Sequence, residues 1–458
     1  MSILKTWEGL LMRVVVSGAG PVGLTAALLL AADGHQVTVY DRRPSAPHAG
    51  SLGVAQAHEG RREFLVRPPH ILPSDVLREL HDELPDIARD LLGRDVWWQD
   101  FPSLVGGWRG TAPGESVPTA LVVPQHVSEA VLSDAAARTP GVGIEPGNGV
   151  AALLTGAERI PSRPHVRGVL TDEGEAVFAD LVVDAAGPES PMVRMLVEAG
   201  APRPLDERQD IGYRLYARQF RAEEAPHGRP RWSLHPFDGL CAGVLYDGLR
   251  TWSVTLCAND EDAELYSLAQ APLWSRALEL YAPHLRLPQG TPEPGVVTTP
   301  RRESRYRRFV VGGRPVATGV LSVGGAWAVS HPLIGLGLAT GLTQALLLRT
   351  VLRGTGPRDA EETALRFDRL IETTLASVYR RAVAWGERSG APAVEPTDQT
   401  IDGQNSPSAD GSAKMSRALV DWLGRLEDVS RAAAGTRPSH DDMLSAVGTG
   451  PTLPCAQL

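Results

Sequence analysis

Residues 13–43 read RVVVSGAGPVGLTAALLLAADGHQVTVYDRR, and this stretch decides the fold of the chain. An apolar run at 14–16 leads into Gly18-x-Gly20-x-x-Gly23, and small apolar residues continue to position 32. A second run, rich in β-branched residues, covers 37–40 and ends on Asp41. The order is strand, glycine-rich turn, helix, strand and acid, which predicts a βαβ unit of a parallel sheet.

The spacing of the glycines predicts a nucleotide site. Gly18 permits the tight turn, Gly20 lets the backbone approach a pyrophosphate, and Gly23 lets the helix pack closely on the sheet. The free N–H groups of the helix N-terminus then face the phosphates. Asp41 follows about 20 residues later, where an acid accepts hydrogen bonds from ribose hydroxyls. We therefore predict an adenine dinucleotide site at this turn.

Length and composition limit the class of protein. A chain of 458 residues exceeds the usual single core, and a net charge of −9 argues against nucleic-acid binding. Cys241, Cys257 and Cys455 are far apart and form no CxxC pair, which predicts neither a disulfide framework nor a zinc site and favours a reducing cytoplasm. No apolar run approaches the roughly 18 residues of a membrane span.

Hydrophobic periodicity predicts the domain organisation. We expect an α/β protein: a Rossmann-type domain at 1–208 with inserted helices and a small β-meander, and an α+β substrate domain on an antiparallel sheet at 209–312. Residues 313–395 return to the first domain and end in a long helix, 396–415 predict a flexible linker, and 416–458 a C-terminal helix and tail. Within the first domain, Ser74 is the predicted N-cap of a helix that Pro85 interrupts.

A second glycine-rich stretch, LSVGGAWAVSHPLIGLGLATGLTQ, covers residues 321–344. A strand runs into Gly324-Gly325, and Gly335-x-Gly337 opens a helix whose N–H groups can face an electron-rich ligand. The alternative is a strand-to-helix connection without a ligand. Together with the first stretch, this one favours a flavin dinucleotide over a nicotinamide one.

Three stretches in this order carry a family resemblance: GAGPVG with Asp41-Arg42, DAAGPESPMVR at 184–194, and GGAWAVSHPLIGLG at 324–337. The chain resembles FAD-dependent monooxygenases of the p-hydroxybenzoate hydroxylase fold, closest in pattern to styrene monooxygenase-like bacterial flavoproteins, over about residues 13–385. The resemblance implies FAD as the cofactor. It assigns FAD contacts to Gly18, Gly20, Pro21, Val22, Gly23, Asp41, Arg42, Gln125, Gly187, Gly325, Pro332, Gly335 and Gly337.

The chain departs from the family pattern at two places. Gly325 stands where the family has an aspartate that accepts hydrogen bonds from the ribityl hydroxyls, a loss of about 1–3 kcal/mol. Ala186 and Glu189 replace the Asp and Arg of the single-component hydroxylases, so no motif for handling NAD(P)H is evident. The electron source is NAD(P)H or a partner flavin reductase, and the second departure favours a separate reductase.

The resemblance places the reacting part of the cofactor near His331, Pro332 and Gly335. His331 either donates to the flavin O4 or moves a proton near N5, or it is a loop histidine held by backbone groups; both interpretations stay open. Aromatic and basic side chains of the second domain are candidates for a substrate pocket, with ordinary core as the alternative: Tyr213, Tyr216, Arg218, Trp232 and Trp252.

The leading functional hypothesis is a cytoplasmic FAD-dependent monooxygenase of secondary metabolism. It would use O2 to hydroxylate or epoxidise a small apolar or aromatic metabolite through a flavin C4a-(hydro)peroxide. One alternative is a flavoprotein fold with altered or lost redox chemistry, such as a cyclase, an isomerase or a scaffold with weakened FAD binding. Another is a flavin oxidase or dehydrogenase.

Overall fold

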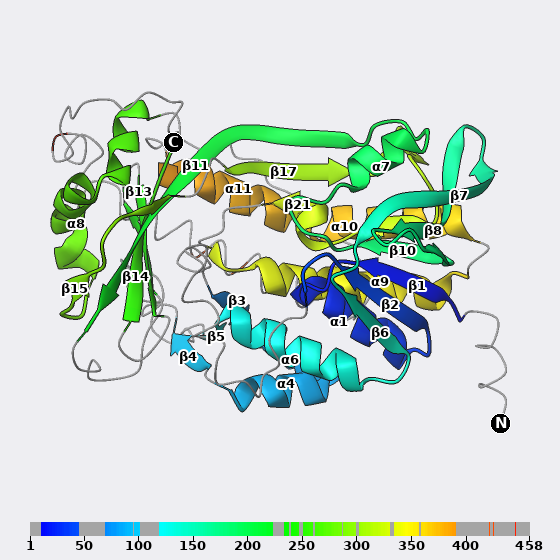
Figure 1. Ribbon diagram of the computed structural model, residues 1–458, viewed down its shortest axis with the longest axis horizontal. Coiled ribbons are helices and arrows are strands. Elements are labelled where there is room, and N and C mark those ends of the chain that lie inside the picture. Colours follow the sequence, from blue (N-terminus) through cyan, green and yellow to red (C-terminus); the bar gives the residue numbers. More distant parts are fainter. Residues whose placement is uncertain are drawn as a thin grey trace.

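The structure is a computed structural model (Figure 1). It describes residues 11–44, 69–94, 96–100, 119–222, 233–237, 240–246, 251–259, 262–285, 287–298, 302–329, 334–356 and 359–390, together with the single positions 421, 425 and 445. The predicted linker at 396–415 and most of the predicted C-terminal helix lie outside these residues, as do His331, Pro332 and Trp232.

A parallel sheet forms the centre of the first domain. Its strand order is β20-β10-β1-β2-β6, and the strands are β1 (Arg13–Ser17), β2 (Gln36–Asp41), β6 (Val142–Pro146), β10 (Leu181–Asp184) and β20 (Val320–Ser322). The strands β1, β10 and β20 are buried almost throughout, as apolar strands covered on both faces should be. This arrangement confirms the predicted Rossmann-type unit.

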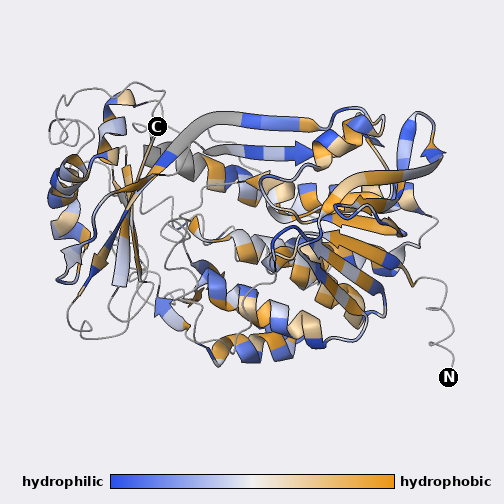
Figure 2. Cartoon of the chain, in the orientation of Figure 1, coloured by the Kyte–Doolittle hydropathy of each residue, from blue (hydrophilic) through white to orange (hydrophobic). Residues whose placement is uncertain are grey.

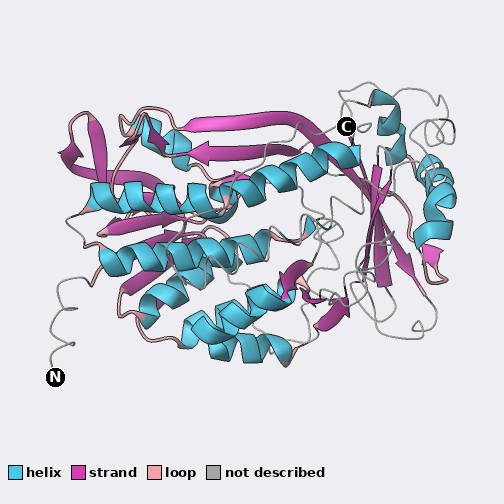
Figure 3. Cartoon of the chain, turned by 180° about the vertical axis from the view of Figure 1, so that it is seen from behind, coloured by secondary structure: helices cyan, strands magenta, loops and turns pink. Residues whose placement is uncertain are grey.

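Three helices run side by side along one face of this sheet: α1 (Pro21–Ala32), α6 (Gln125–Arg138) and α9 (Gly337–Gly354) (Figures 1 and 3). α1 and α9 approach closely because Gly341 has no side chain; a Cβ there would lie 2.2 Å from Val22 Cγ2. At the far end, the nearly buried Arg349 of α9 binds Asp33 at 2.6 Å and 2.9 Å and Glu83 at 2.6 Å. Packing and charge therefore fix α9 against α1.

Smaller elements surround the sheet. β3 (His70–Pro73), β5 (Thr119–Val123) and β4 (Trp97–Asp100) pair beside α3 (Ser74–Glu83) and α4 (Pro85–Leu92). The predicted meander is present as β7 (Val150–Ile160), β8 (Arg163–Thr171) and β9 (Ala176–Phe178), followed by α7 (Met192–Glu198). Ser74 is the first residue of α3 rather than its cap; Pro73 holds the cap position, where no side-chain cap bond forms among the described residues.

An antiparallel sheet builds the second domain. Its main order is β12-β13-β14-β11-β17-β21, and β15 (Thr291–Pro292) and β16 (Val297–Thr298) also pair with β11. The main strands are β12 (Ser233–Phe237), β13 (Leu240–Tyr246), β14 (Thr251–Asn259), β11 (Leu205–Arg221), β17 (Arg302–Arg308) and β21 (Ala328–Val329). The 3-10 helix η3 (Ala263–Ala269) and α8 (Ala271–Leu285) lie on its outer face (Figure 1). The fold is thus α/β with a second α+β unit, as predicted.

The strand β11 joins the two domains. Its first residues pair with β17 and its later ones with β14, so the predicted boundary between 208 and 209 falls inside one continuous strand. The long helix predicted at the end of the first domain is two helices, α10 (Ala360–Thr374) and α11 (Ala376–Gly390), which meet at Leu375.

The hydropathy of the described residues follows this architecture. Apolar residues dominate the strands of the parallel sheet, while hydrophilic residues alternate with apolar ones along α6 (Figure 2). No helix in the described part of the chain combines the length and the apolar character that crossing a membrane requires.

Candidate functional site

Of the three glycines in the turn after β1, Gly20 has room for a side chain, whereas Gly18 and Gly23 do not. Gly18 has φ +111°, and a Cβ on it would lie 2.5 Å from the Ala185 carbonyl oxygen; one on Gly23 would lie 2.1 Å from the Gly18 oxygen. A Cβ on Gly20 would meet nothing within 4 Å among the described residues. Gly18 and Gly23 are therefore required by packing, whereas Gly20 leaves space in front of α1.

That space lies at a helix N-terminus suited to an anion. Pro21 is the first helical residue, and α1 has no side-chain cap bond within the described part of the chain. The first N–H groups of a helix have no partner inside it and carry partial positive charge. A helix start of this kind can hold an anion such as a pyrophosphate.

Asp41 ends β2 next to this turn and is almost fully engaged within the protein. Its Oδ2 accepts from the Ala19 N–H at 2.7 Å and from Arg43 Nη2 at 2.9 Å. Its Oδ1 accepts from the Arg43 backbone N–H at 2.8 Å and from Arg43 Nε at 3.1 Å. Burial pushes the pKa of Asp41 upward, but the hydrogen bonds from Arg43 outweigh burial and leave that pKa below its usual value.

A carboxylate offers about four lone-pair sites, so Asp41 can receive a ribose only if Arg43 turns away. The Arg43 side chain is 58% exposed and free to swing into solvent. Arg42, predicted near the ribose, points elsewhere. Its guanidinium binds Asp172 at 2.9 Å and the Val150 carbonyl at 2.7 Å, which ties the end of β2 to the meander.

The second glycine-rich stretch also has an open position at a helix N-terminus. Gly337 is the first residue of α9, and a Cβ on it would meet nothing within 4 Å among the described residues. Gly335 has φ +71°, its carbonyl accepts from the Ile71 N–H at 2.8 Å, and a Cβ there would lie 2.6 Å from Ile71 Cγ1. Gly335 therefore connects the turn to β3 through a hydrogen bond, and Gly337 leaves free space at the start of α9.

Residues 187–188 occupy the space in which a side chain at position 325 would lie. A Cβ on Gly325 would lie 2.8 Å from Pro188 Cδ, 3.0 Å from Pro188 N and 3.2 Å from the Gly187 carbonyl carbon. Gly187, predicted to lie beneath the cofactor, has φ +80° and turns the chain toward Gly325. The lack of a side chain at 325 is thus matched by the close approach of residues 187–188.

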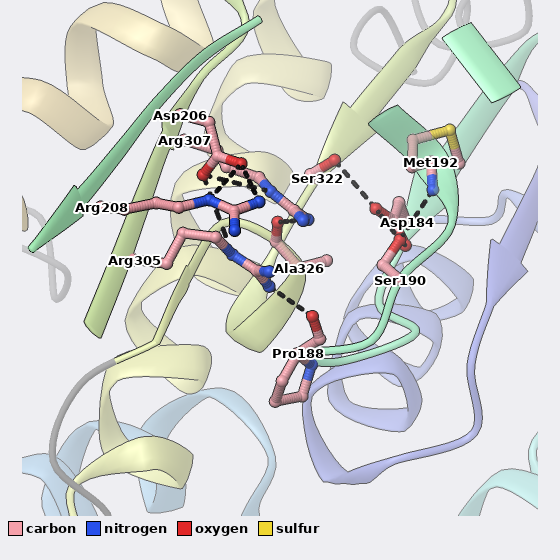
Figure 4. A network of polar contacts seen from close by, with 10 residues as sticks. All are labelled: Asp184, Pro188, Ser190, Met192, Asp206, Arg208, Arg305, Arg307, Ser322 and Ala326. Atoms are coloured by element: carbon pink, nitrogen blue, oxygen red, sulfur yellow. Dashed lines mark hydrogen bonds and ion pairs between the residues drawn. The ribbon is translucent and has the colours of Figure 1, made fainter. Parts of the chain in front are cut away.

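A buried polar network holds this approach in place (Figure 4). Asp184, at the end of β10, accepts from Ser190 Oγ at 2.7 Å and 2.8 Å and from Ser322 Oγ at 3.1 Å. Burial raises the pKa of Asp184, and the hydrogen bonds from Ser190 oppose that rise. The loop after β10 is therefore anchored to β20, beside the second glycine-rich turn.

Arginines of β17 complete the network from the second domain. Arg305 donates to the Pro188 carbonyl, and the buried Arg307 donates to the Ala326 carbonyl at 3.0 Å. Asp206 Oδ1 lies 4.0 Å from Arg305 Nε and 3.9 Å from Arg307 Nε (Figure 4). The base of the second domain is thereby linked to both loops that flank Gly325.

Gln125 begins α6, as the resemblance implies, with Pro124 at the cap position. Its carbonyl accepts a hydrogen bond from Ser128 Oγ at 2.8 Å, and Ser128 Oγ in turn lies 2.9 Å from His70 Nδ1. The sequence reasoning missed His70. Its place at the start of a short apolar strand, 70–72, was the available signal.

The predicted substrate pocket does not form as expected. Tyr216 and Trp252 are buried in the core beneath α8. Arg218 donates to Ser275 Oγ of α8 at 2.7 Å and to the Glu293 carbonyl at 2.9 Å. These three side chains point to the outer face of the sheet, away from the first domain. Trp232 lies outside the described residues, and for Tyr213 only the backbone is described.

The opposite face of the same sheet looks toward the first domain. Because side chains alternate along a strand, Leu215, Cys257 and Cys241 occupy that inner face, and they pack in the same core as the parallel sheet. α11 packs against β11, β13 and β14, and these three side chains are at most 3% exposed, so they belong to the core rather than to an open pocket wall. Among the described residues, no group of three His, Cys, Asp or Glu side chains is placed to hold a metal ion.

Comparison with known proteins finds similarity over the N-terminal part of the chain. Residues 13–110 match the family model described as FAD dependent oxidoreductase. A D-amino acid dehydrogenase of Dechloromonas aromatica is 44% identical over 68 residues, or 14% of this chain and 15% of that protein. One from Cereibacter sphaeroides is 63% identical over 35 residues, 8% of each. These matches cover a small part of the curated relatives' length.

The whole fold is found among flavin-dependent oxygenases and halogenases. PqsL of Pseudomonas aeruginosa, a probable FAD-dependent monooxygenase, superposes with a TM-score of 0.59 at 18% identity, covering 91% of this chain and 99% of PqsL. The flavin-dependent halogenase CmlS gives 0.60 at 16% identity, covering 91% of this chain and 78% of CmlS. The chain is thus similar to FAD dependent oxidoreductases over residues 13–110, and its overall fold is shared with PqsL and CmlS.

Proposed function

We propose that this chain is an FAD-dependent monooxygenase. The observation that carries the proposal is the pair of open helix N-termini, at Gly20 and Gly337, which lie at the carboxyl edge of one parallel sheet. In open α/β sheets, ligands bind at that edge. Two helix N-termini at the same edge suit a cofactor with a pyrophosphate at one end and an electron-rich ring at the other.

The residues present fit FAD. The N–H groups at the start of α1 would hold the pyrophosphate, and those at the start of α9 would stabilise negative charge on the ring. Once reduced, bound FAD supplies the activation of O2 for transfer of one oxygen atom. The buried apolar residues of the inner face, Leu215, Cys241 and Cys257, would keep water out of the core between the two domains.

The resemblance to styrene monooxygenase-like flavoproteins favours a small or mid-sized apolar or aromatic substrate. PqsL has been crystallised with 2-aminobenzoylacetate, which makes that compound a reasonable first probe. Ala186 and Glu189 depart from the pattern of single-component hydroxylases, which supports reduction by a partner flavin reductase that uses NAD(P)H. The same proposal includes a role in secondary metabolism in the cytoplasm. The reaction would be an epoxidation or hydroxylation like those of styrene monooxygenase-like enzymes.

The test begins with the visible spectrum of the purified protein and a titration with FAD. The loaded protein is then reduced anaerobically with NADH or NADPH, with and without a flavin reductase, and exposed to isotopically labelled O2 and 2-aminobenzoylacetate or simple aromatic alkenes. Incorporation of one labelled oxygen atom into a product supports the proposal. Absence of FAD binding at excess cofactor refutes it, and substrate-driven bleaching of FAD without O2 would indicate an oxidase or dehydrogenase.

One observation favours a second candidate function. Pro188 fills the space beside Gly325, and Arg43 occupies the Asp41 carboxylate, so two expected cofactor contacts are taken by the protein itself. A protein of this fold that has lost oxygen chemistry, such as a cyclase, an isomerase or a scaffold, would tolerate both. It predicts product formation without reductant or O2, or no turnover at all.

A further inference from the structure

His70 lies between two parts of the proposed cofactor site. It is the first residue of β3 and pairs with Val123, the last residue of β5, directly before Pro124 and the start of α6. The next residue of β3, Ile71, donates its N–H to the Gly335 carbonyl at 2.8 Å. One strand therefore carries His70 at the N-terminus of α6 and holds the turn that opens α9.

The hydrogen bonds of His70 determine which ring nitrogen carries the proton. Ser128 Oγ donates its single proton to the Gln125 carbonyl at 2.8 Å, so it can only accept from His70 Nδ1, which lies 2.9 Å away. Nδ1 is then the protonated nitrogen, and Nε2 carries a lone pair. Burial lowers the pKa of His70 from 6.5 to about 4, which keeps the ring neutral near pH 7.

The Nε2 lone pair is an acceptor without a hydrogen-bond partner among the described residues. FAD, the proposed cofactor, carries hydroxyl donors that match this acceptor. Its ribityl chain carries hydroxyl donors between the pyrophosphate and the ring, and buried hydroxyls are nearly always hydrogen-bonded. Gly325 supplies no acceptor, and Pro188 leaves no room for one there.

We propose that His70 Nε2 accepts a hydrogen bond from a ribityl hydroxyl of FAD, in place of the carboxylate that is missing at position 325. Ser128 is the positioning residue: it holds Nδ1 in the protonated form and leaves the Nε2 lone pair available as an acceptor. This inference rests on the proposed function, because it requires FAD to lie between α1 and α9.

The experiment compares two ligands and two substitutions. ADP shares the pyrophosphate of FAD but lacks the ribityl chain, so it reports on the other half of the site. In His70→Asn the amide still donates to Ser128 but the acceptor at the Nε2 position is lost. In His70→Gln the longer amide returns an acceptor near the Nε2 position. His81→Asn, an exposed histidine on α3, is the matched control.

We expect His70→Asn to weaken FAD binding by about 2- to 12-fold while ADP affinity and the thermal midpoint of the apoprotein stay unchanged. His70→Gln should bind FAD within about 2-fold of the parent, and Ser128→Ala should fall between them because the histidine can then take either tautomer. Affinities are measured by flavin fluorescence quenching and by calorimetry.

The outcomes separate this inference from the proposed function. If the unaltered protein binds FAD and His70→Asn binds it equally well, the role of His70 is refuted while the proposed function stands. An equal loss of ADP and FAD affinity in His70→Asn also refutes it, because the change is then a general disturbance of the site. If the unaltered protein does not bind FAD, the proposed function fails, and this inference fails with it.

Discussion

Substitution of Gly325 by aspartate tests whether the missing family carboxylate can simply be restored. The new Cβ would lie 2.8 Å from Pro188 Cδ and 3.0 Å from Pro188 N, distances that real Cβ contacts essentially never show or rarely reach. The obstacle is a proline ring and backbone rather than the end of a flexible side chain. Pro188 is also held at its carbonyl by Arg305, and Ser190 anchors the same loop to Asp184.

The expected magnitude follows from overpacking. Forcing extra atoms into a filled site costs about 1–3 kcal/mol, and at about 2 cal/mol/K of unfolding entropy per residue this lowers Tm by about 1–3 °C in a chain of 458 residues. FAD affinity should not rise, because the loop displaced by the new side chain flanks the same site. With room available, a restored acceptor would instead tighten FAD binding by about 5- to 150-fold.

The assay consists of thermal denaturation and FAD titration of four variants: Gly325→Asp, Gly325→Ala, Pro188→Ala and the combination of Gly325→Asp with Pro188→Ala. Gly325→Ala isolates the Cβ, and Pro188→Ala removes the ring atom nearest to it. Combined with Gly325→Asp, Pro188→Ala should recover part of the lost stability, a coupling of about 0.5–3 kcal/mol in a double-mutant cycle. A Gly325→Asp protein as stable as the parent and with tighter FAD binding would refute the reasoning.

Four further predictions concern charges and thiols. Arg43→Gln should free the Asp41 carboxylate and strengthen ADP binding by about 2- to 12-fold in calorimetry; weaker binding would contradict competition for Asp41. The same change should reduce the stability lost on acidification through the lowered pKa of Asp41, seen as a flatter plot of Tm against pH. For Asp184 the sign is opposite, because burial raises its pKa. Its contribution to stability is full below the ordinary pKa of 3.8 and falls as pH rises through the raised pKa. The Asp184→Asn protein should lack this fall in a plot of Tm against pH. Cys241 and Cys257 are buried, and burial raises the pKa of both thiols. In a Cys455→Ser protein, neither thiol should therefore react with a disulfide reagent until the chain is unfolded. Rapid labelling of the native protein would show that the inner face is open.

The sequence predicted the first βαβ unit well because its signals are local. The roles of Gly18 and Gly23 follow from the turn and the helix next to them, and the structure shows both closed by backbone atoms. The helix that starts at Gly337 and the meander before β10 were also predicted, since each has its own periodicity and turn residues.

The pocket could not be predicted in the same way. Alternation along β11 and β14 correctly separates two faces, but it does not say which face meets the first domain. The large aromatic residues Tyr216 and Trp252 suggested a pocket wall, yet large aromatic side chains are also the ones that best fill a core beneath a helix. Only the position of α8, fixed by distant residues, decides between these roles.

The environment of Asp41 and Gly325 was hidden for a similar reason. Arg43 lies two residues from Asp41, but nothing in the sequence indicates that its side chain turns back to the carboxylate. Pro188 is 137 residues from Gly325, and the contact exists only because β10 and β20 pair as neighbours.

The short segment 185–188 connects the two halves of the proposed site. At its start, the Ala185 carbonyl limits Gly18, and Ala185 Cβ lies 3.1 Å from the position of a Cβ on Gly23. At its end, Pro188 limits Gly325. A displacement of this segment therefore shifts the turn before α1 and the 3-10 turn Gly324–Ala326 together. The Asp184 network that anchors the segment thus holds the first glycine-rich turn and Gly325 in a fixed relation to each other.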